Sequence, residues 1–128
     1  MRYLCIYKSA QPEGRPPSHE EMARMGQFIE QETKAGVLIT SEGCLPSALG
    51  ARVRLSNGKV TVTDGPFAET KELIGGLAII QANSKEEAIE SVKRFLNVAG
   101  DGETEVRALY DASVNFSCNE TSAASAAD

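Results

Sequence analysis

The residues best suited to chemistry lie in one stretch, Asp64–Glu72, which reads DGPFAETKE. It holds three carboxylates and one ammonium group beside Phe67, an aromatic residue that a polar loop does not need. Asp-Gly-Pro is typical of a tight turn, because Asp can bond its own backbone, Gly65 tolerates positive φ, and Pro66 fixes φ. The pattern therefore predicts a rigid loop at a strand end, where binding groups commonly sit.

Each residue type in this loop suggests a role. Asp64 is the candidate catalytic residue, since a carboxylate whose pKa is raised by burial can accept a proton at working pH. Phe67 would supply an apolar wall and Lys71 would neutralise an anionic group, while Glu69 and Tyr7 could assist. In the alternative interpretation, Asp64 caps the turn, Phe67 fills the core, and the remaining charges form a solvated edge.

Composition limits the classes of function. The 128 residues suit one domain, and the net charge of -5 with scattered Lys and Arg argues against nucleic acid as a direct partner. No apolar run approaches the length of a membrane span, and the first residues lack the features of a secretory signal. We therefore expect a cytoplasmic protein that does not enter the membrane.

The cysteines and the histidine do not form a metal-binding pattern. Cys5, Cys44 and Cys118 show no CxxC spacing, and Cys5 and Cys44 are predicted to be buried thiols. The single histidine, His19, is expected to be exposed in the first turn of a helix. We predict no metal and no cofactor, although carboxylates alone can hold a transient Mg²⁺.

Periodicity and turn signals give the order of elements. Ser18 and Ser84 each precede a glutamate by three positions, the capping-box pattern, and Gly36 and Gly100 follow the two predicted helices. Met22, Met25 and Ile29 recur at helical spacing in the first of them. Asn57-Gly58 between alternating runs predicts a hairpin. The remaining segments are predicted strands over residues 3–7, 37–40, 52–55, 59–63, 73–82 and 105–110.

This order predicts an α+β, ferredoxin-like βαββαβ fold with an inserted hairpin. Two helices can cover one face of the sheet, but residues 3–7 offer apolar side chains to both faces. We therefore expect a homodimer that packs sheet against sheet as a dimeric α+β barrel, with higher oligomers also open. A monomer whose hairpin folds over the open face is the alternative. The domain is predicted over residues 1–112, with a disordered tail over 113–128.

The motif Asp64–Glu72, continuing into Gly75-Gly76, closely resembles the YCII-related proteins, specifically their DGPF-domain branch. Further matches extend the resemblance over about residues 1–110: Met1-Arg2-Tyr3-Leu4, Gly36-Val37-Leu38, Glu42-Gly43 with Leu45 and Pro46, and Glu105-Val106-Arg107. The resemblance implies a dimeric α+β barrel.

Two functional associations come with this resemblance. Some YCII relatives resemble small enzymes in which a His-Asp pair moves protons, including a dehydrochlorinase of chlorinated hydroxyquinols. Asp64 matches the first motif residue, but Met25 and Gln27 stand where the histidine would be expected, so that pair does not transfer to His19. DGPF-domain proteins are also linked to extracytoplasmic-function sigma factors. Three interpretations thus stay open: a small-molecule-binding protein with enzymatic activity, a regulatory domain that contacts a sigma factor, and a purely structural oligomeric module.

Overall fold

The computed structural model describes residues 1–67 and 73–110. The elements, in chain order, are β1 (Arg2–Ser9), α1 (His19–Lys34), β2 (Leu38–Gly43), the 3₁₀ turn η1 (Ser47–Leu49), β3 (Ala51–Ser56), β4 (Lys59–Asp64), β5 (Gly76–Gln81), α2 (Lys85–Ala99) and β6 (Gly102–Ala108). The predictions for Glu69, Lys71 and the tail over 113–128 lie outside the described residues.

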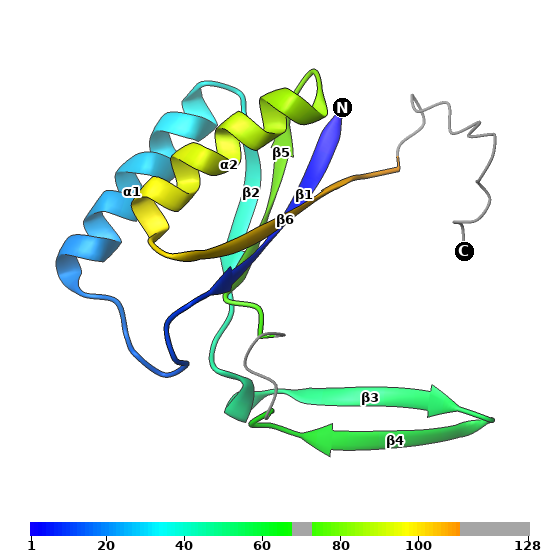
Figure 1. Cartoon of the computed structure of the whole chain (residues 1–128). Coiled ribbons are helices and arrows are strands. Elements are labelled where there is room, and N and C mark those ends of the chain that lie inside the picture. Colours follow the sequence, from blue (N-terminus) through cyan, green and yellow to red (C-terminus); the bar gives the residue numbers. More distant parts are fainter. Residues whose placement is uncertain (68–72, 111–128) are drawn as a thin grey trace.

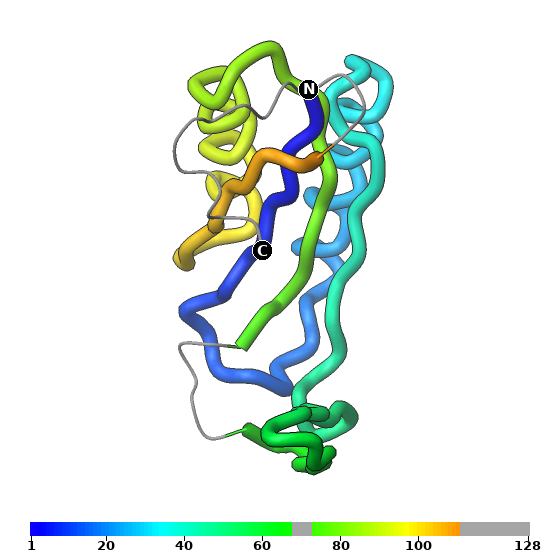
Figure 2. Tube along the Cα trace, turned by 90° about the vertical axis from the view of Figure 1, so that its right-hand side faces the viewer, coloured from blue at the N-terminus to red at the C-terminus, as the bar shows by residue number. Residues whose placement is uncertain are grey.

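Four strands form one antiparallel sheet in the order β2-β5-β1-β6. Both helices cover the same face of this sheet, and the opposite face is open (Figure 1). Figure 2, seen from the open side, shows the four strands in front of the helices. The predicted α+β ferredoxin-like arrangement is therefore confirmed, because both right-handed crossovers place their helices on one side. Neither described helix is long and apolar enough to cross a membrane.

Capping residues define the helix ends largely as predicted. The Ser18 side chain accepts a hydrogen bond from the Glu21 amide, and the Glu21 carboxylate accepts one from the Ser18 amide, which completes the capping box of α1. At α2 the Ser84 hydroxyl accepts from the Glu87 amide, but the Glu87 carboxylate bonds the amide of Asn83 instead of Ser84. The second capping box is therefore only half formed.

The core lies between the sheet and the helices, and it is small. Its buried apolar residues are Tyr3, Cys5, Ile80, Ala82 and Ala88. One prediction about a buried residue was wrong: Cys44 is exposed, beyond the end of β2. Met22 on α1 is 57% exposed, whereas the ring of Phe28 lies 6.3 Å from that of Phe95 on α2.

The chain between β2 and β5 departs from the predicted boundaries. β2 continues to Gly43, three residues further than expected, and β5 begins only at the second glycine of the pair. A side chain on Gly76 would come within 2.9 Å of the Glu42 carbonyl oxygen. This close backbone approach allows β2 to pair with β5.

The hairpin of β3 and β4 is a separate two-stranded sheet. Its turn residues Asn57 and Gly58 have φ values of 53° and 76°, as a two-residue hairpin turn requires. The hairpin extends away from the main sheet on the side opposite the helices (Figure 1), and every residue of both strands is exposed. The alternative of a monomer whose hairpin folds over its own open face is therefore wrong for this structure.

Candidate functional site

The start of the motif loop lies directly against η1. The Gly65 amide donates a hydrogen bond to the Gly50 carbonyl oxygen at 3.0 Å. A Cβ atom on Gly65 would lie 1.7 Å from the Ser47 carbonyl oxygen, so no other residue fits without a backbone shift. The peptide bond to Pro66 is cis. The glycine is thus explained by close backbone packing, and it does not use the positive φ that glycine tolerates.

A short hydrogen-bond network joins three distant segments at this point. The Glu13 carboxylate accepts from the Ser47 amide at 2.8 Å and from the Ser47 hydroxyl at 2.7 Å. The same hydroxyl oxygen accepts from the Phe67 amide at 3.1 Å. Because Ser47 opens η1, Glu13 also satisfies a backbone donor at the start of that turn. The network holds the motif loop, η1 and the connection after β1 together.

A cavity of about 250 Å³ lies beside this network. It combines polar and apolar lining residues, namely Glu13, Leu45, Ser47, Arg52, Phe67, Leu73 and Ile74. The Arg52 guanidinium carbon lies 4.0 Å from the centroid of the Phe67 ring, a cation–π contact that places positive charge at the cavity. This volume is below the range of about 300–1,000 Å³ typical of pockets for drug-sized ligands.

The described structure brings only Phe67, of the predicted site residues, to this cavity. Asp64 is the last residue of β4, where it pairs with Ala51, and its exposed side chain is not among the lining residues. Glu69 and Lys71 lie outside the described residues. The roles predicted for Asp64, Glu69 and Lys71 stay predictions.

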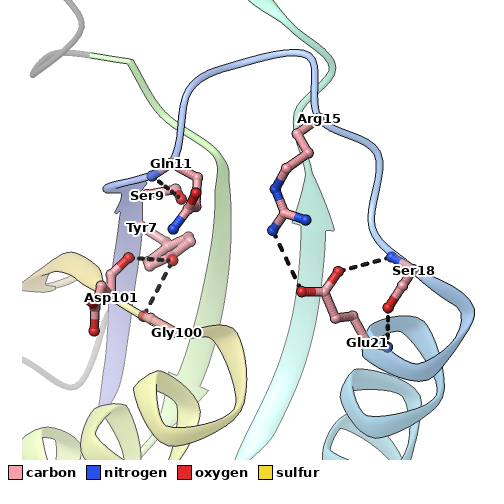
Figure 3. Close-up of polar contacts among 8 residues, drawn as sticks. All are labelled: Tyr7, Ser9, Gln11, Arg15, Ser18, Glu21, Gly100 and Asp101. Carbon is pink, nitrogen blue, oxygen red and sulfur yellow. Dashed lines mark hydrogen bonds and ion pairs between the residues drawn. The ribbon is translucent and has the colours of Figure 1, made fainter.

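Tyr7 lies on the helix side of the sheet. Its hydroxyl donates to the carbonyl oxygens of Asp101 at 3.2 Å and Gly100 at 3.4 Å (Figure 3). Its ring meets the Phe95 ring edge-on, with centroids 5.1 Å apart. These contacts connect β1 to the end of α2, and Tyr7 is not among the residues that line the cavity. The role of Tyr7 as a ligand contact therefore stays a prediction.

The connection that carries Glu13 is held at its far end by charged contacts. The Glu21 carboxylate accepts from the Ser18 amide at 2.8 Å and contacts the Arg15 guanidinium at 3.5 Å (Figure 3). The Ser18 backbone bond, helped by the charge of Arg15, lowers the pKa of Glu21 below its usual value. His19, the first residue of α1, is exposed as predicted.

All three polar lining residues were missed from the sequence: Glu13, Ser47 and Arg52. Glu13 lies 34 residues before Ser47, and Ser47 lies 20 before Phe67. No spacing rule relates positions so far apart, and both Glu13 and Ser47 stand in segments that read as irregular connections. The only available signal was Arg52, a cation near the start of β3, the hairpin strand whose first residues pair with the end of β4 beside the motif.

Cys5 on β1 is a buried free thiol. Burial raises the pKa of Cys5 to about 11, so its thiol is protonated at neutral pH. Residues 1–67 and 73–110 contain no group of three or more His, Cys, Asp or Glu side chains placed to hold a metal ion.

Comparison with known proteins places the chain in a family. An uncharacterized protein of Rhizobium meliloti (strain 1021) is 38% identical over 77 residues, which cover 59% of this chain and 62% of that protein. The chain thus aligns with less than two thirds of that relative's length. A solved structure of 5-chloro-2-hydroxyhydroquinone dehydrochlorinase from Burkholderia phenoliruptrix AC1100, in complex with 2,5-dihydroxybenzoquinone, covers 86% of this chain and 94% of its own, at 18% identity and a TM-score of 0.44. The YCII-related domain family model matches residues 1–113, and the chain therefore belongs to that family.

Proposed function

We propose that this protein binds a small polar or aromatic molecule in the cavity beside the motif loop. The observation that supports this most directly is the composition of the cavity wall. A carboxylate (Glu13) and a guanidinium (Arg52) face the same 250 Å³ space as the apolar side chains of Phe67 and Leu73. A few polar groups set into an apolar wall are typical of small-molecule sites.

The hydrogen bonds already made by Ser47 and Glu13 suggest which polar groups a ligand would carry. The Ser47 hydroxyl already donates to Glu13 and accepts from Phe67. Glu13 accepts two hydrogen bonds from Ser47, and an ionised carboxylate can accept about four. A ligand hydroxyl could therefore donate to Glu13, while an anionic or acceptor group would favour the Arg52 side. Hydroxylated aromatic compounds and short hydroxy acids meet both requirements.

We propose further that the protein is an enzyme that transfers a proton of the bound molecule. Asp64 would accept or hold that proton, as the motif suggested. What supports this is position, because Asp64 stands three residues before Phe67 on the same anchored loop. Asp64 does not line the cavity itself, so a ligand would have to extend past the wall to reach it. Because the chain carries the motif Asp64–Glu72, we also propose that it belongs to the DGPF branch of the YCII-related family.

The test is a thermal-shift screen of phenols, lactones and short acids on the wild type, Phe67→Ala and Asp101→Asn. Asp101 provides the control because only its backbone carbonyl bonds Tyr7, which Asp101→Asn keeps, and Asp101 is not among the residues that line the cavity. A ligand at about 100 times its Kd adds about 2.7 kcal/mol to the free energy of unfolding. This corresponds to a rise in Tm of roughly 5–20 °C.

The variants separate binding from chemistry. A compound that stabilises the wild type and Asp101→Asn but not a folded Phe67→Ala places the ligand at the cavity. Equal shifts in Phe67→Ala, or no shift with any compound, would contradict the binding proposal. For Asp64→Asn, we expect retained binding and lost turnover of the same compound. If turnover persisted in that variant, Asp64 would not be the proton acceptor, and the binding proposal would still stand.

A further inference from the structure

The hairpin of β3 and β4 is a basic segment in an acidic chain. Residues 51–63 contain three cations and no carboxylate, whereas the whole chain carries a net charge of -5. Side chains alternate along each strand, and residues paired across the two strands share a face, so all three cations lie on the same face of the hairpin. This basic face consists of Arg52, Arg54, Ser56, Lys59, Thr61 and Thr63.

The positive charge of the basic face is not neutralised by its own hairpin. Asp64, the last residue of β4, alternates with Thr63 and therefore lies on the opposite face. Every residue of both strands is exposed, and the hairpin extends away from the main sheet (Figure 1). Within the described residues, the side chains of Arg54 and Lys59 form no ion pair. An anion that approaches this face therefore meets cations that are open to it.

The basic face continues into the cavity at Arg52. Arg52 is a lining residue, and its guanidinium carbon lies 4.0 Å from the centroid of the Phe67 ring. Arg54 stands two residues further along β3 on the same face, about 7 Å away at the ordinary rise of a strand. Arg54 is not a lining residue, so it lies outside the cavity, on the side toward the hairpin turn. A molecule that extends from the cavity along β3 therefore passes from one arginine to the next.

We propose that Arg52 and Arg54 form an anion subsite that binds the acidic end of the ligand held in the cavity. This inference rests on the proposed function and names the ligand class: an elongated molecule with a hydroxyl group at one end and a carboxylate or phosphate at the other. The hydroxyl donates to Glu13 in the cavity wall, and the anionic group accepts hydrogen bonds from both guanidinium groups. The hydroxyls of Thr61 and Thr63, which pair with the two arginines across the hairpin, are further donors on the same face.

The test compares 4-hydroxycinnamate with its neutral amide, two compounds of nearly the same shape that differ in the charge at one end. Isothermal titration calorimetry measures the Kd of each compound for the wild type, Arg54→Gln and Arg24→Gln. Arg24 is an exposed cation of α1, so this control removes the same charge from a different element. Because an exposed ion pair contributes about threefold in affinity, the two arginines together predict about tenfold.

We expect the wild type and Arg24→Gln to bind the acid about tenfold more tightly than the amide, and Arg54→Gln to bind it only about threefold more tightly, with an unchanged Kd for the amide. In the wild type, the Arg54 side-chain Nε–H resonance should shift with the acid and not with the amide, a measurement that needs no variant.

The subsite is overturned by equal Kd values for acid and amide in the wild type, by a full preference for the acid in Arg54→Gln, or by an unshifted Arg54 resonance. The cavity proposal survives those results if both compounds bind the wild type and bind Phe67→Ala more weakly. If neither compound binds the wild type, the subsite and its ligand class are wrong, and the thermal-shift screen decides the cavity proposal separately.

Discussion

Replacing Gly65 with alanine is the sharpest test of how the motif loop is held. The added Cβ would stand 1.7 Å from the Ser47 carbonyl oxygen and 2.5 Å from its carbon, whereas ordinary contact begins near 3.4 Å. The loop and η1 must therefore separate by about 1.7 Å, the difference between 3.4 and 1.7 Å. Because the obstacle is backbone, no side-chain rotation can relieve the overlap.

The cost follows from the bonds that such a shift would break. The Gly65–Gly50 bond of 3.0 Å and the Phe67–Ser47 bond of 3.1 Å would both exceed hydrogen-bond range. Each contributes about 0.5–1.5 kcal/mol, so we expect a loss of about 1–3 kcal/mol. None of the strand pairs of the main sheet runs through this loop, so the loss is expected mainly at the hairpin base.

Native-state hydrogen exchange is the suitable assay, because it reports local opening. A loss of about 1–3 kcal/mol predicts that the Phe67 amide exchanges roughly 5 to 150 times faster in Gly65→Ala than in the wild type. The control is Gly26→Ala in α1, where nothing lies within 4 Å of the new atom. It should stabilise the protein by about 0.5–1 kcal/mol through helix propensity. Unchanged protection of Phe67 in Gly65→Ala would refute the packing argument.

Three further predictions use other parts of the structure. At pH 8 a thiol reagent should modify exposed Cys44 at least about tenfold faster than Cys5, whose pKa of about 11 leaves little thiolate; equal rates by peptide mass spectrometry would contradict this. The lowered pKa of Glu21 stabilises the protein above the usual value of 4.5, and this contribution is lost as pH falls through the lower folded pKa. The Tm advantage of the wild type over Glu21→Gln should therefore shrink below pH 4.5, whereas a constant difference down to pH 3 would argue against it. Tyr7→Phe should cost about 0.5–1.5 kcal/mol in urea unfolding, through the lost bonds to Gly100 and Asp101, and should leave ligand shifts unchanged. A reduced ligand shift would instead show that Tyr7 acts at the cavity.

Local signals account for the parts of the fold that the sequence predicted well. A capping serine and its glutamate lie three residues apart, and Asn57-Gly58 specifies its turn through φ values that few other residues adopt. The order of such elements, with the rule on crossover handedness, was enough to place both helices on one face of the sheet. The second capping box is half formed because the Glu87 carboxylate accepts its hydrogen bond from the Asn83 amide, at 2.6 Å.

The sequence by itself determined the elements, their order, and the position of the motif at the end of a hairpin. Only the tertiary structure decided that Glu13 and Ser47 meet Phe67, that Cys44 is exposed, and that the hairpin extends outward. The physical reason is the separation along the chain between the residues that interact. Caps and turns depend on atoms a few residues apart, whereas the cavity depends on contacts between segments separated by 20 and 34 residues, which are set by the packing of the whole chain.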